Sequence, residues 1–263
     1  MHLPRLDGRT SGSRRIRSIG LVASAVLVTA CSTAVPAATK QAQAYTQQAN
    51  LKLLDLPSGW SSQGPASNSL TTSTLSQSQS KTVHSLLSGL PAICRPLDAT
   101  FTASLVGAPP VGTIAQSQSQ FSSASDGNAQ ISSTVAVFAN LARSRSTYAL
   151  YATPSFSNCL QQFLRATLTK VFNLSSASVT VTTSPTPVPP TGVKTTAFSV
   201  AQSGAHVGSQ SNVSVSDEMV IQSGKAMAFV EVQSATTSLP PDALNVFYES
   251  AAKVVHRLVS PPS

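Results

Sequence analysis

The sequence predicts an α+β protein with a single domain, in which a twisted antiparallel sheet packs against amphipathic helices behind a cleaved lipoprotein signal peptide. Three observations predict it. An apolar run ends in the lipobox-like segment Leu27–Ala30, directly before Cys31. Segments with alternating apolar residues are then interrupted by segments with apolar residues at helical spacing. About 230 residues follow Cys31, enough for one domain with its own core.

Residues 1–30 have the three-part layout of a secretory signal, with an arginine-rich start, about a dozen apolar or small residues, and small residues at the cleavage site. The apolar run is shorter than the roughly twenty residues that a permanent transmembrane helix needs. We therefore expect cleavage before Cys31 and acylation of this residue, with two or three lipid chains holding the protein at the membrane. The expected location is the extracytoplasmic face of the cell membrane.

Charge is informative only after the signal is removed. The full chain has a formal net charge of +8, but residues 1–30 contain five arginines and one aspartate. The mature net charge is therefore +4. Nucleic-acid binding would favour clustered Lys and Arg interleaved with aromatic residues, but the remaining basic residues are scattered from Lys40 to Arg257. Weak attraction to anionic lipid or wall polymer fits this charge, and so does a purely solubilising role.

Composition divides the rest of the chain. Residues 31–43 are predicted to be the lipidated cysteine and a flexible tether, and residues 44–263 the extracytoplasmic domain. The Ser-, Thr- and Gln-rich segment Gln63–Ser80 is predicted to be a mobile surface loop. Prolines make Ser184–Thr191 an exposed, extended connection, whose hydroxyl groups also fit O-glycosylation.

Periodicity predicts the elements between these segments. Apolar residues at helical spacing predict helices over Lys81–Leu90 and from Thr153-Pro154 to about Val171, and alternation predicts a strand over 129–137. Further strands are predicted over 179–183, 195–201, 213–222 and 225–234, with Ser223-Gly224 as a hairpin turn. Pro240-Pro241 opens a final helix with a continuous apolar stripe.

Cys94 and Cys159 are the only thiols left after lipidation of Cys31. An exported protein lies in an oxidising compartment, so a disulfide between them is the simplest interpretation. A redox or metal site is the alternative, but the sequence has no C-x-x-C pair and no histidine at ligand spacing. We expect no metal and no cofactor.

No catalytic residue is predicted. His84, His206 and His256 have neighbourhoods without other reactive groups, and the sequence has no G-x-S-x-G motif. Ser78-Gln79-Ser80-Lys81 matches S-x-x-K, but about one such match is expected by chance in so serine-rich a chain. The companion motifs of penicillin-interacting enzymes are incomplete at Lys194-Thr195-Thr196 and interrupted at 125–128.

Three further residues are candidates for a site. Asp217 and Glu218 are adjacent on a predicted strand, so their side chains are expected on opposite faces, where they cannot act on one bond. An inward-facing member of this pair would be notable, but a solvated strand edge is the simpler interpretation. Trp60 is the only tryptophan and is expected in the core, with a ligand-stacking role as the alternative.

A family resemblance follows from several short segments: Leu54–Trp60, the strand Val135–Phe138 followed by Ala142–Leu150, Cys159, and the terminal hairpin with its helix. The chain resembles actinobacterial envelope lipoproteins related to the extracellular sensor domains of mycobacterial receptor serine/threonine kinases. PsbP-like lipoproteins share the same α+β character. The resemblance implies a twisted antiparallel sheet packed on helices, with a groove for an envelope ligand, and it designates no binding residues.

The leading hypothesis is thus a non-catalytic, lipid-anchored, sensor-like domain that binds an envelope ligand or protein. One alternative is a cell-envelope hydrolase, another is a lipid carrier, and a third is a scaffold for a protein partner without a small ligand.

Overall fold

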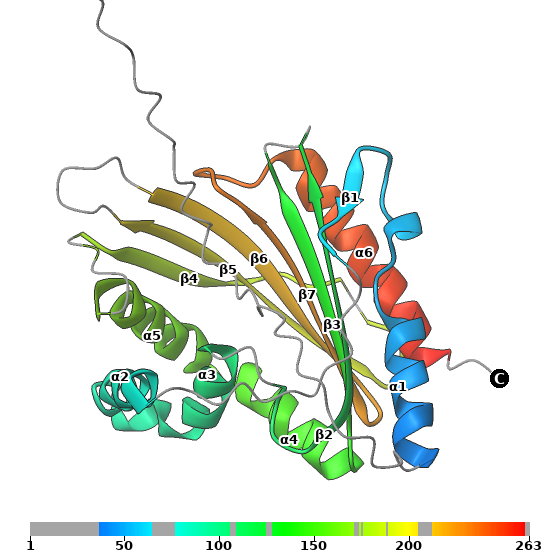
Figure 1. The fold of residues 1–263 in the computed structure, drawn as a ribbon, viewed down its shortest axis with the longest axis horizontal. Helices are drawn as coiled ribbons and strands as arrows, with labels where there is room; N and C mark the ends of the chain where they lie inside the picture. Colours follow the sequence, from blue (N-terminus) through cyan, green and yellow to red (C-terminus); the bar gives the residue numbers. More distant parts are fainter. Residues whose placement is uncertain are drawn as a thin grey trace, which may run out of the picture.

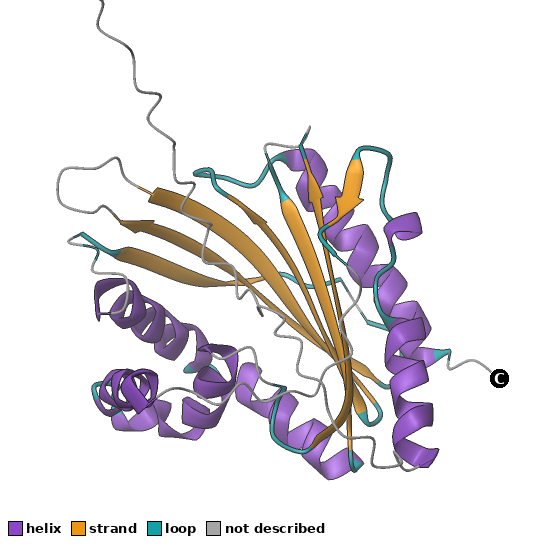
Figure 2. Ribbon diagram, viewed as in Figure 1, coloured by secondary structure: helices purple, strands orange, loops and turns teal. Residues whose placement is uncertain are grey.

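The structure is a computed structural model and describes residues 37–64, 77–105, 109–124, 128–170, 174, 176–187, 189–204 and 212–260. Within these residues, seven strands form one antiparallel sheet with helices packed on both faces (Figures 1 and 2). The predicted α+β class is therefore confirmed. Cys31 and the predicted signal peptide lie outside the described residues. No described helix is both long and apolar enough to cross a membrane.

The strands lie across the sheet in the order β1-β2-β3-β7-β6-β5-β4, and every neighbouring pair is antiparallel. Their bounds are β1 (Trp60–Ser62), β2 (Thr113–Ser123), β3 (Gln130–Phe138), β4 (Ser178–Ser184), β5 (Val193–Gly204), β6 (Asn212–Ser223) and β7 (Ala226–Ser234). The helices are α1 (Ala37–Ala49), η1 (Leu53–Asp55), α2 (Gln77–Ser88), η2 (Ala92–Leu97), α3 (Asp98–Leu105), α4 (Leu141–Tyr151), α5 (Phe156–Lys170) and α6 (Pro241–Val259).

Helices α1 and α6 cover one face of the sheet (Figure 1). Pro241 stands at the start of α6, where its missing N–H costs no hydrogen bond. The buried side of α6 includes Phe247, which is 1% exposed, and packs on Ile131 and Met219 from the central strands. Trp60 belongs to this core and is 7% exposed, so its expected role in packing is confirmed.

Helices α2 to α5 form the layer on the other face (Figure 2). Helix α5 lies against β4, α2 packs on α5, and α4 crosses β3, β7 and β6. The core of this layer contains the stacked rings of Phe101 and Phe163, whose centroids are 4.5 Å apart. The predicted disulfide between Cys94 of η2 and Cys159 of α5 is present, with a Cα–Cα distance of 5.5 Å, and both cysteines are fully buried.

Two of the expected loops are partly helical. The flexible tether expected over 31–43 is wrong for residues 37–43, because these residues form the start of α1. The Gln43 side chain also contacts the domain and donates a hydrogen bond to the Gln116 carbonyl at 3.1 Å. Likewise the loop expected over Gln63–Ser80 ends earlier, because α2 begins at Gln77. In both cases small and polar residues join a helix whose apolar side packs on the domain.

Strand β2 was not predicted, because its sequence TIAQSQSQFSS alternates polar residues with mostly small ones. Its outer edge would expose unpaired backbone groups beyond its short pairing with β1. Helix α1 packs beside β2, and its Gln43 side chain donates to the Gln116 carbonyl of β2 at 3.1 Å. Directly after the helix, Asn50 donates to the Ser117 hydroxyl at 3.2 Å and Ser119 donates to the Leu51 carbonyl at 3.0 Å. The tertiary contact therefore makes a weakly patterned segment a strand.

Candidate functional site

Two glutamates face each other at the centre of the sheet. Glu218 of β6 and Glu231 of β7 are direct partners in the antiparallel register, so their side chains leave the sheet on the same face. The turn between these strands consists of Gly224 and Lys225. Gly224 has a φ of +55°, a conformation that glycine adopts without strain. The position of this turn sets the register that brings the two carboxyl groups together.

The pair lies where this face of the sheet changes from apolar to polar. Close to α4, the face presents the buried side chains of Ala136 and Met227. Two rows further along, the register aligns Ser132, Glu231 and Glu218. The change occurs on the central strands β3, β7 and β6, whereas β5 and β4 stay apolar on this face, with Phe198, Val200 and Val181 buried. On the central strands, a polar surface therefore begins at the level of the two glutamates.

A chain of amide groups extends this polar surface across three strands. Gln120 of β2 and Gln233 of β7 both donate hydrogen bonds to the Oε1 atom of Gln130 on β3, at 3.1 and 3.0 Å. Within the described residues, no hydrogen bond uses the Oε1 atoms of Gln120 and Gln233. The surface therefore offers acceptors to a ligand beside the carboxyl pair.

Aromatic rings border the carboxyl pair on the helix side. Tyr151, the last residue of α4, lies edge-on to Phe229 with a centroid distance of 5.3 Å and contacts Phe156 at 5.1 Å. Phe156 in turn contacts Phe198, the β5 register partner of Glu218. The two charged groups thus have an apolar wall on one side and amide and hydroxyl groups on the other.

These surroundings determine the ionisation of the pair. Burial raises the pKa of Glu218 to about 8, and the negative charge of Glu231 acts in the same direction. Burial also raises the pKa of Glu231 to about 7, although hydrogen bonds from Ser132 and Ser216 oppose this rise. No Lys or Arg in the described part of the chain forms an ion pair with either carboxylate. Near neutral pH the two carboxyl groups therefore hold a proton between them, so one donates hydrogen bonds and the other accepts them.

Tyr151 keeps its proton in this setting. Burial raises the pKa of its hydroxyl, and the charge of nearby Glu218 raises it further. The tyrosine is therefore a neutral hydrogen-bond donor at the border of the site.

The prediction that Asp217 and Glu218 point to opposite faces is confirmed by the alternation along β6. The expected solvated edge is wrong, because β6 lies between β5 and β7 and both carboxylates are partly buried. Burial raises the pKa of Asp217, while a hydrogen bond from Ser199 lowers it. Glu231, the partner of Glu218, was not among the candidates from the sequence.

The other residues weighed from the sequence do not join this site. His84 on α2 and His256 on α6 are exposed, and His206 lies outside the described residues. Ser80 and Lys81 lie on α2, and Lys194-Thr195-Thr196 lies at the start of β5. Residues 125–127 of the interrupted motif are also outside the described residues. In the part of the chain that the structure describes, no group of three or more His, Cys, Asp or Glu is placed to hold a metal ion.

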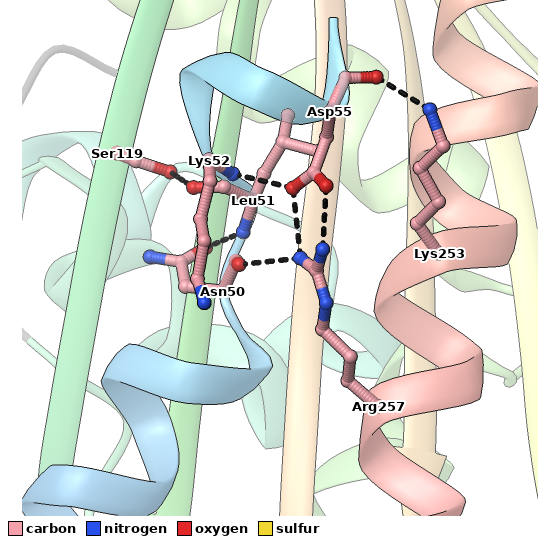
Figure 3. A network of polar contacts seen from close by, with 7 residues as sticks. All are labelled: Asn50, Leu51, Lys52, Asp55, Ser119, Lys253 and Arg257. Atoms are coloured by element: carbon pink, nitrogen blue, oxygen red, sulfur yellow. Dashed lines mark hydrogen bonds and ion pairs between the residues drawn. The ribbon is translucent and has the colours of Figure 1, made fainter.

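A second polar cluster, on the opposite face, fastens α6 to the segment between α1 and β1 (Figure 3). Arg257 donates to both carboxylate oxygens of Asp55 and to the Asn50 carbonyl, the latter at 2.9 Å. Lys253 donates to the Asp55 carbonyl, and the Lys52 N–H donates to the Asp55 carboxylate at 2.7 Å. Partial burial acts to raise the pKa of Asp55, but the hydrogen bonds from Arg257 and Lys52 hold it below its ordinary value. The cluster is thus a structural clasp.

Replacing Arg257 by alanine should lower the free energy of unfolding by about 1 to 2 kcal/mol, because a bidentate, partly buried pair is lost. Urea unfolding followed by the fluorescence of Trp60 measures this loss. In a double-mutant cycle, Asp55→Asn should cost little more once Arg257 is gone. Arg165→Ala, an exposed arginine on α5, is the matched control, and an equal loss in the control would contradict the clasp.

Next to this clasp lies a cavity of about 270 Å³ between α1, η1, β1 and β2, lined in part by Asn50, Lys52, Ser117 and Phe121. Asn50 is already satisfied there, since it donates to Ser117 and accepts from the Leu51 N–H at 2.9 Å. The amide of Asn50 is therefore not available to a ligand in this cavity.

Fold and site together define a single-domain α+β protein whose central sheet carries two facing, partly buried carboxyl groups with raised pKa values. No protein-family model and no curated protein matches the sequence. The extracellular domain of PknH from Mycobacterium tuberculosis has a similar structure, with 12% identity, 83% of this chain and 96% of that chain covered, and a TM-score of 0.43. A putative uncharacterized protein from Mycobacterium smegmatis, an Rv0999 ortholog, matches at 9% identity over 77% of this chain and 92% of its own, with a TM-score of 0.36. The first protein is of the group that the sequence resembles, and the likeness concerns the fold.

Proposed function

We propose that this protein is a lipid-anchored extracytoplasmic binding protein whose ligand lies on the polar half of the sheet, centred on Glu218 and Glu231. The observation that carries the proposal is the position of this pair, which lies at the boundary between the helix-covered and the polar part of one sheet face. A stable domain gains nothing from two unpaired, partly buried carboxyl groups, because their desolvation costs free energy. Groups kept at such a cost are typical of functional sites.

The chemistry of the surface favours a polyhydroxylated ligand such as a sugar. Hydroxyl groups both donate and accept hydrogen bonds, and near neutral pH the carboxyl pair does the same. The amides of Gln120, Gln130 and Gln233 add donors and acceptors along three strands. Tyr151 and Phe229 supply an aromatic edge for the apolar side of a sugar ring.

The position in the cell rests on the sequence. The lipobox-like segment before Cys31 supports export and acylation, and the buried disulfide between Cys94 and Cys159 suits an oxidising compartment. The intact mass of the protein purified from its host membrane tests this part, because two or three acyl chains on Cys31 add a defined mass. Cys31→Ser should abolish that addition, and an unmodified wild-type protein would refute the anchor.

Ligand binding has its own test. Calorimetry against a panel of neutral oligosaccharides should find a ligand whose affinity falls at least tenfold in Glu218→Gln and in Glu231→Gln, because neither variant can share a proton between two carboxyl groups. Glu249→Gln, on the exposed side of α6, is the matched control and should bind as the wild type does. A sugar that binds equally well to all four proteins would place its site elsewhere.

A second function, hydrolysis of an envelope polysaccharide, is favoured by the same carboxyl pair, because glycoside hydrolases use one carboxylic acid and one carboxylate. We favour binding, since hydrogen bonds from Ser132 and Ser216 stabilise the charged form of Glu231, which suits an acceptor for ligand hydroxyl groups. Release of new reducing ends from the oligosaccharide that binds, lost in both glutamine variants, would establish hydrolysis instead.

A further inference from the structure

Several segments meet at the end of the domain where α1 begins (Figure 1). The Phe138 N–H donates to the Lys225 carbonyl at 2.9 Å, and the Ala139 N–H donates to the Gly112 carbonyl at 3.1 Å. These bonds join the end of β3 to the β6–β7 turn and to the loop before β2. Helix α4 begins at the same end, because it follows the end of β3. Strand β5 also begins there, because its first residues pair with the last residues of β6.

This end of the domain is basic. Exposed Lys40 of α1, Arg143 of α4, Lys194 of β5 and Lys225 of the β6–β7 turn all lie there. No Asp or Glu occurs in the segments that form it, namely 37–43, 109–113, 139–145, 192–195 and 223–226. No ion pair involves these four basic residues within the described part of the chain.

An apolar side chain stands among these charges. Val111, in the loop before β2, is 64% exposed. The neighbouring residue Gly112 has a φ of +90°, and the side chain of Arg143 packs across it, so that an added Cβ would lie 2.9 Å from the arginine Cγ. Arg143 is thereby held beside Val111. Exposed apolar and basic side chains together are the composition of surfaces that lie at a lipid headgroup layer.

The chain length before α1 sets the distance from this end to the proposed anchor. Only six residue steps separate Cys31 from Ala37, which span at most about 20 Å when fully extended. An acylated Cys31 lies at the membrane surface, so the basic end cannot move far from the headgroups. A connection of this length allows the basic residues to approach the headgroups to within about 8 Å, the distance over which charges at physiological salt are not yet largely screened.

We infer that the basic end formed by Lys40, Arg143, Lys194 and Lys225 docks on anionic lipid headgroups, which turns the polar half of the sheet in a defined direction relative to the membrane. The inference rests on the proposed anchor at Cys31 and goes beyond the proposed ligand. The partner is the bilayer that holds the anchor, since complementary charge and the short connection both favour it.

Lysine footprinting on the acylated protein tests this inference. The protein is reconstituted in vesicles of phosphatidylcholine alone or of phosphatidylcholine mixed with phosphatidylglycerol, and acetylation of each lysine is measured by mass spectrometry. On the anionic vesicles, Lys40, Lys194 and Lys225 should be acetylated about fivefold more slowly than on neutral ones, and high salt should remove the difference. Lys81 on α2 and Lys170 on α5 are internal controls whose acetylation should not change.

Paired variants complete the test. Lys40→Gln/Lys225→Gln should abolish the protection of Lys194, whereas Arg165→Gln/Lys170→Gln, with the same loss of charge on α5, should preserve it. Uniform acetylation of all lysines on both vesicles, or equal protection without anionic lipid, would overturn the inference. A mass without acyl chains would refute the proposed anchor instead of the docking. In that case, sedimentation of the protein with anionic but not with neutral vesicles would show that the basic end binds lipid by itself, and no sedimentation with either would refute the docking.

Discussion

Removing the disulfide should destabilise the domain more than any other change considered, by about 4 kcal/mol in the double variant Cys94→Ala/Cys159→Ala. The bond closes a loop with a sequence separation of 65 residues, and in the chain-entropy model a loop of this length restricts the unfolded chain by about that amount. Both cysteines are fully buried beside Phe101 and Phe163, so the alanines also leave small cavities. A loss of this size is a large part of the stability of an ordinary domain.

Urea unfolding of the wild type and the variant, each with and without reductant, measures this effect. Trp60 reports on the opposite side of the sheet from the disulfide, so a loss seen in its fluorescence is a loss for the whole domain. Reductant should lower the wild-type stability to slightly above that of the variant, whose alanines also leave small cavities, and should leave the variant unchanged. A difference below about 1 kcal/mol between the two oxidised proteins would show that η2 and α5 hold together without the bond.

The second large effect is a fall in stability as the pH rises from about 5 to 8. Burial raises the pKa values of Glu218 and Glu231 above the ordinary value of 4.5, to about 8 and about 7. Between 4.5 and these values the folded protein binds more protons than the unfolded chain, so the free energy of unfolding decreases with pH. Asp217, whose pKa is raised as well, contributes with the same sign.

Asp55 has the opposite sign, because its lowered pKa makes the domain lose stability as the pH falls below about 3.8. The free energy of unfolding should therefore be greatest near pH 4. Unfolding curves measured in urea from pH 2 to pH 9 test both sides of this profile.

Glu218→Gln should flatten the alkaline side of the profile and raise the stability at pH 8 by at least about 1 kcal/mol, because the remaining carboxylate loses a neighbouring charge. Glu249→Gln, exposed on α6, should leave the profile unchanged. If Glu218→Gln destabilised the domain at pH 8, the pair would hold an attractive contact rather than repelling charges. A stabilised variant with weakened ligand binding would instead show that the pair is kept for function.

Elements with strong local patterns were predictable from the sequence. Helices α5 and α6 and strands β3 to β7 match their predicted positions within a few residues, because their apolar residues repeat with one clear period. Strand β2 and helix α1 have no such pattern, and each is stabilised by contact with the other. The tether was overestimated for the same reason.

A one-residue error in the predicted position of the β6–β7 turn is enough to miss the pairing of Glu218 with Glu231. A turn at Ser223-Gly224 would place Glu218 opposite Phe229, whereas the observed turn at Gly224-Lys225 places it opposite Glu231. A shift of the turn by one residue moves the β7 partner of Glu218 by two positions and keeps it on the same face of the sheet. The alternation of apolar and polar residues therefore cannot distinguish the two turns. The local signal in the sequence was Gly224 itself, since glycine suits a turn position with the positive φ that Gly224 adopts in the structure.

By itself, the sequence determined the α+β class, the pairing of Cys94 with Cys159 and the opposite orientation of Asp217 and Glu218. These follow from composition, from the number of thiols and from alternation along one strand, all of which are local properties. Only the tertiary structure decided that Glu218 meets Glu231, that Asp55 meets Arg257, and that four scattered basic residues share one end. The physical reason is that register and helix packing bring together residues far apart in the chain, and no local pattern records which distant residues they join.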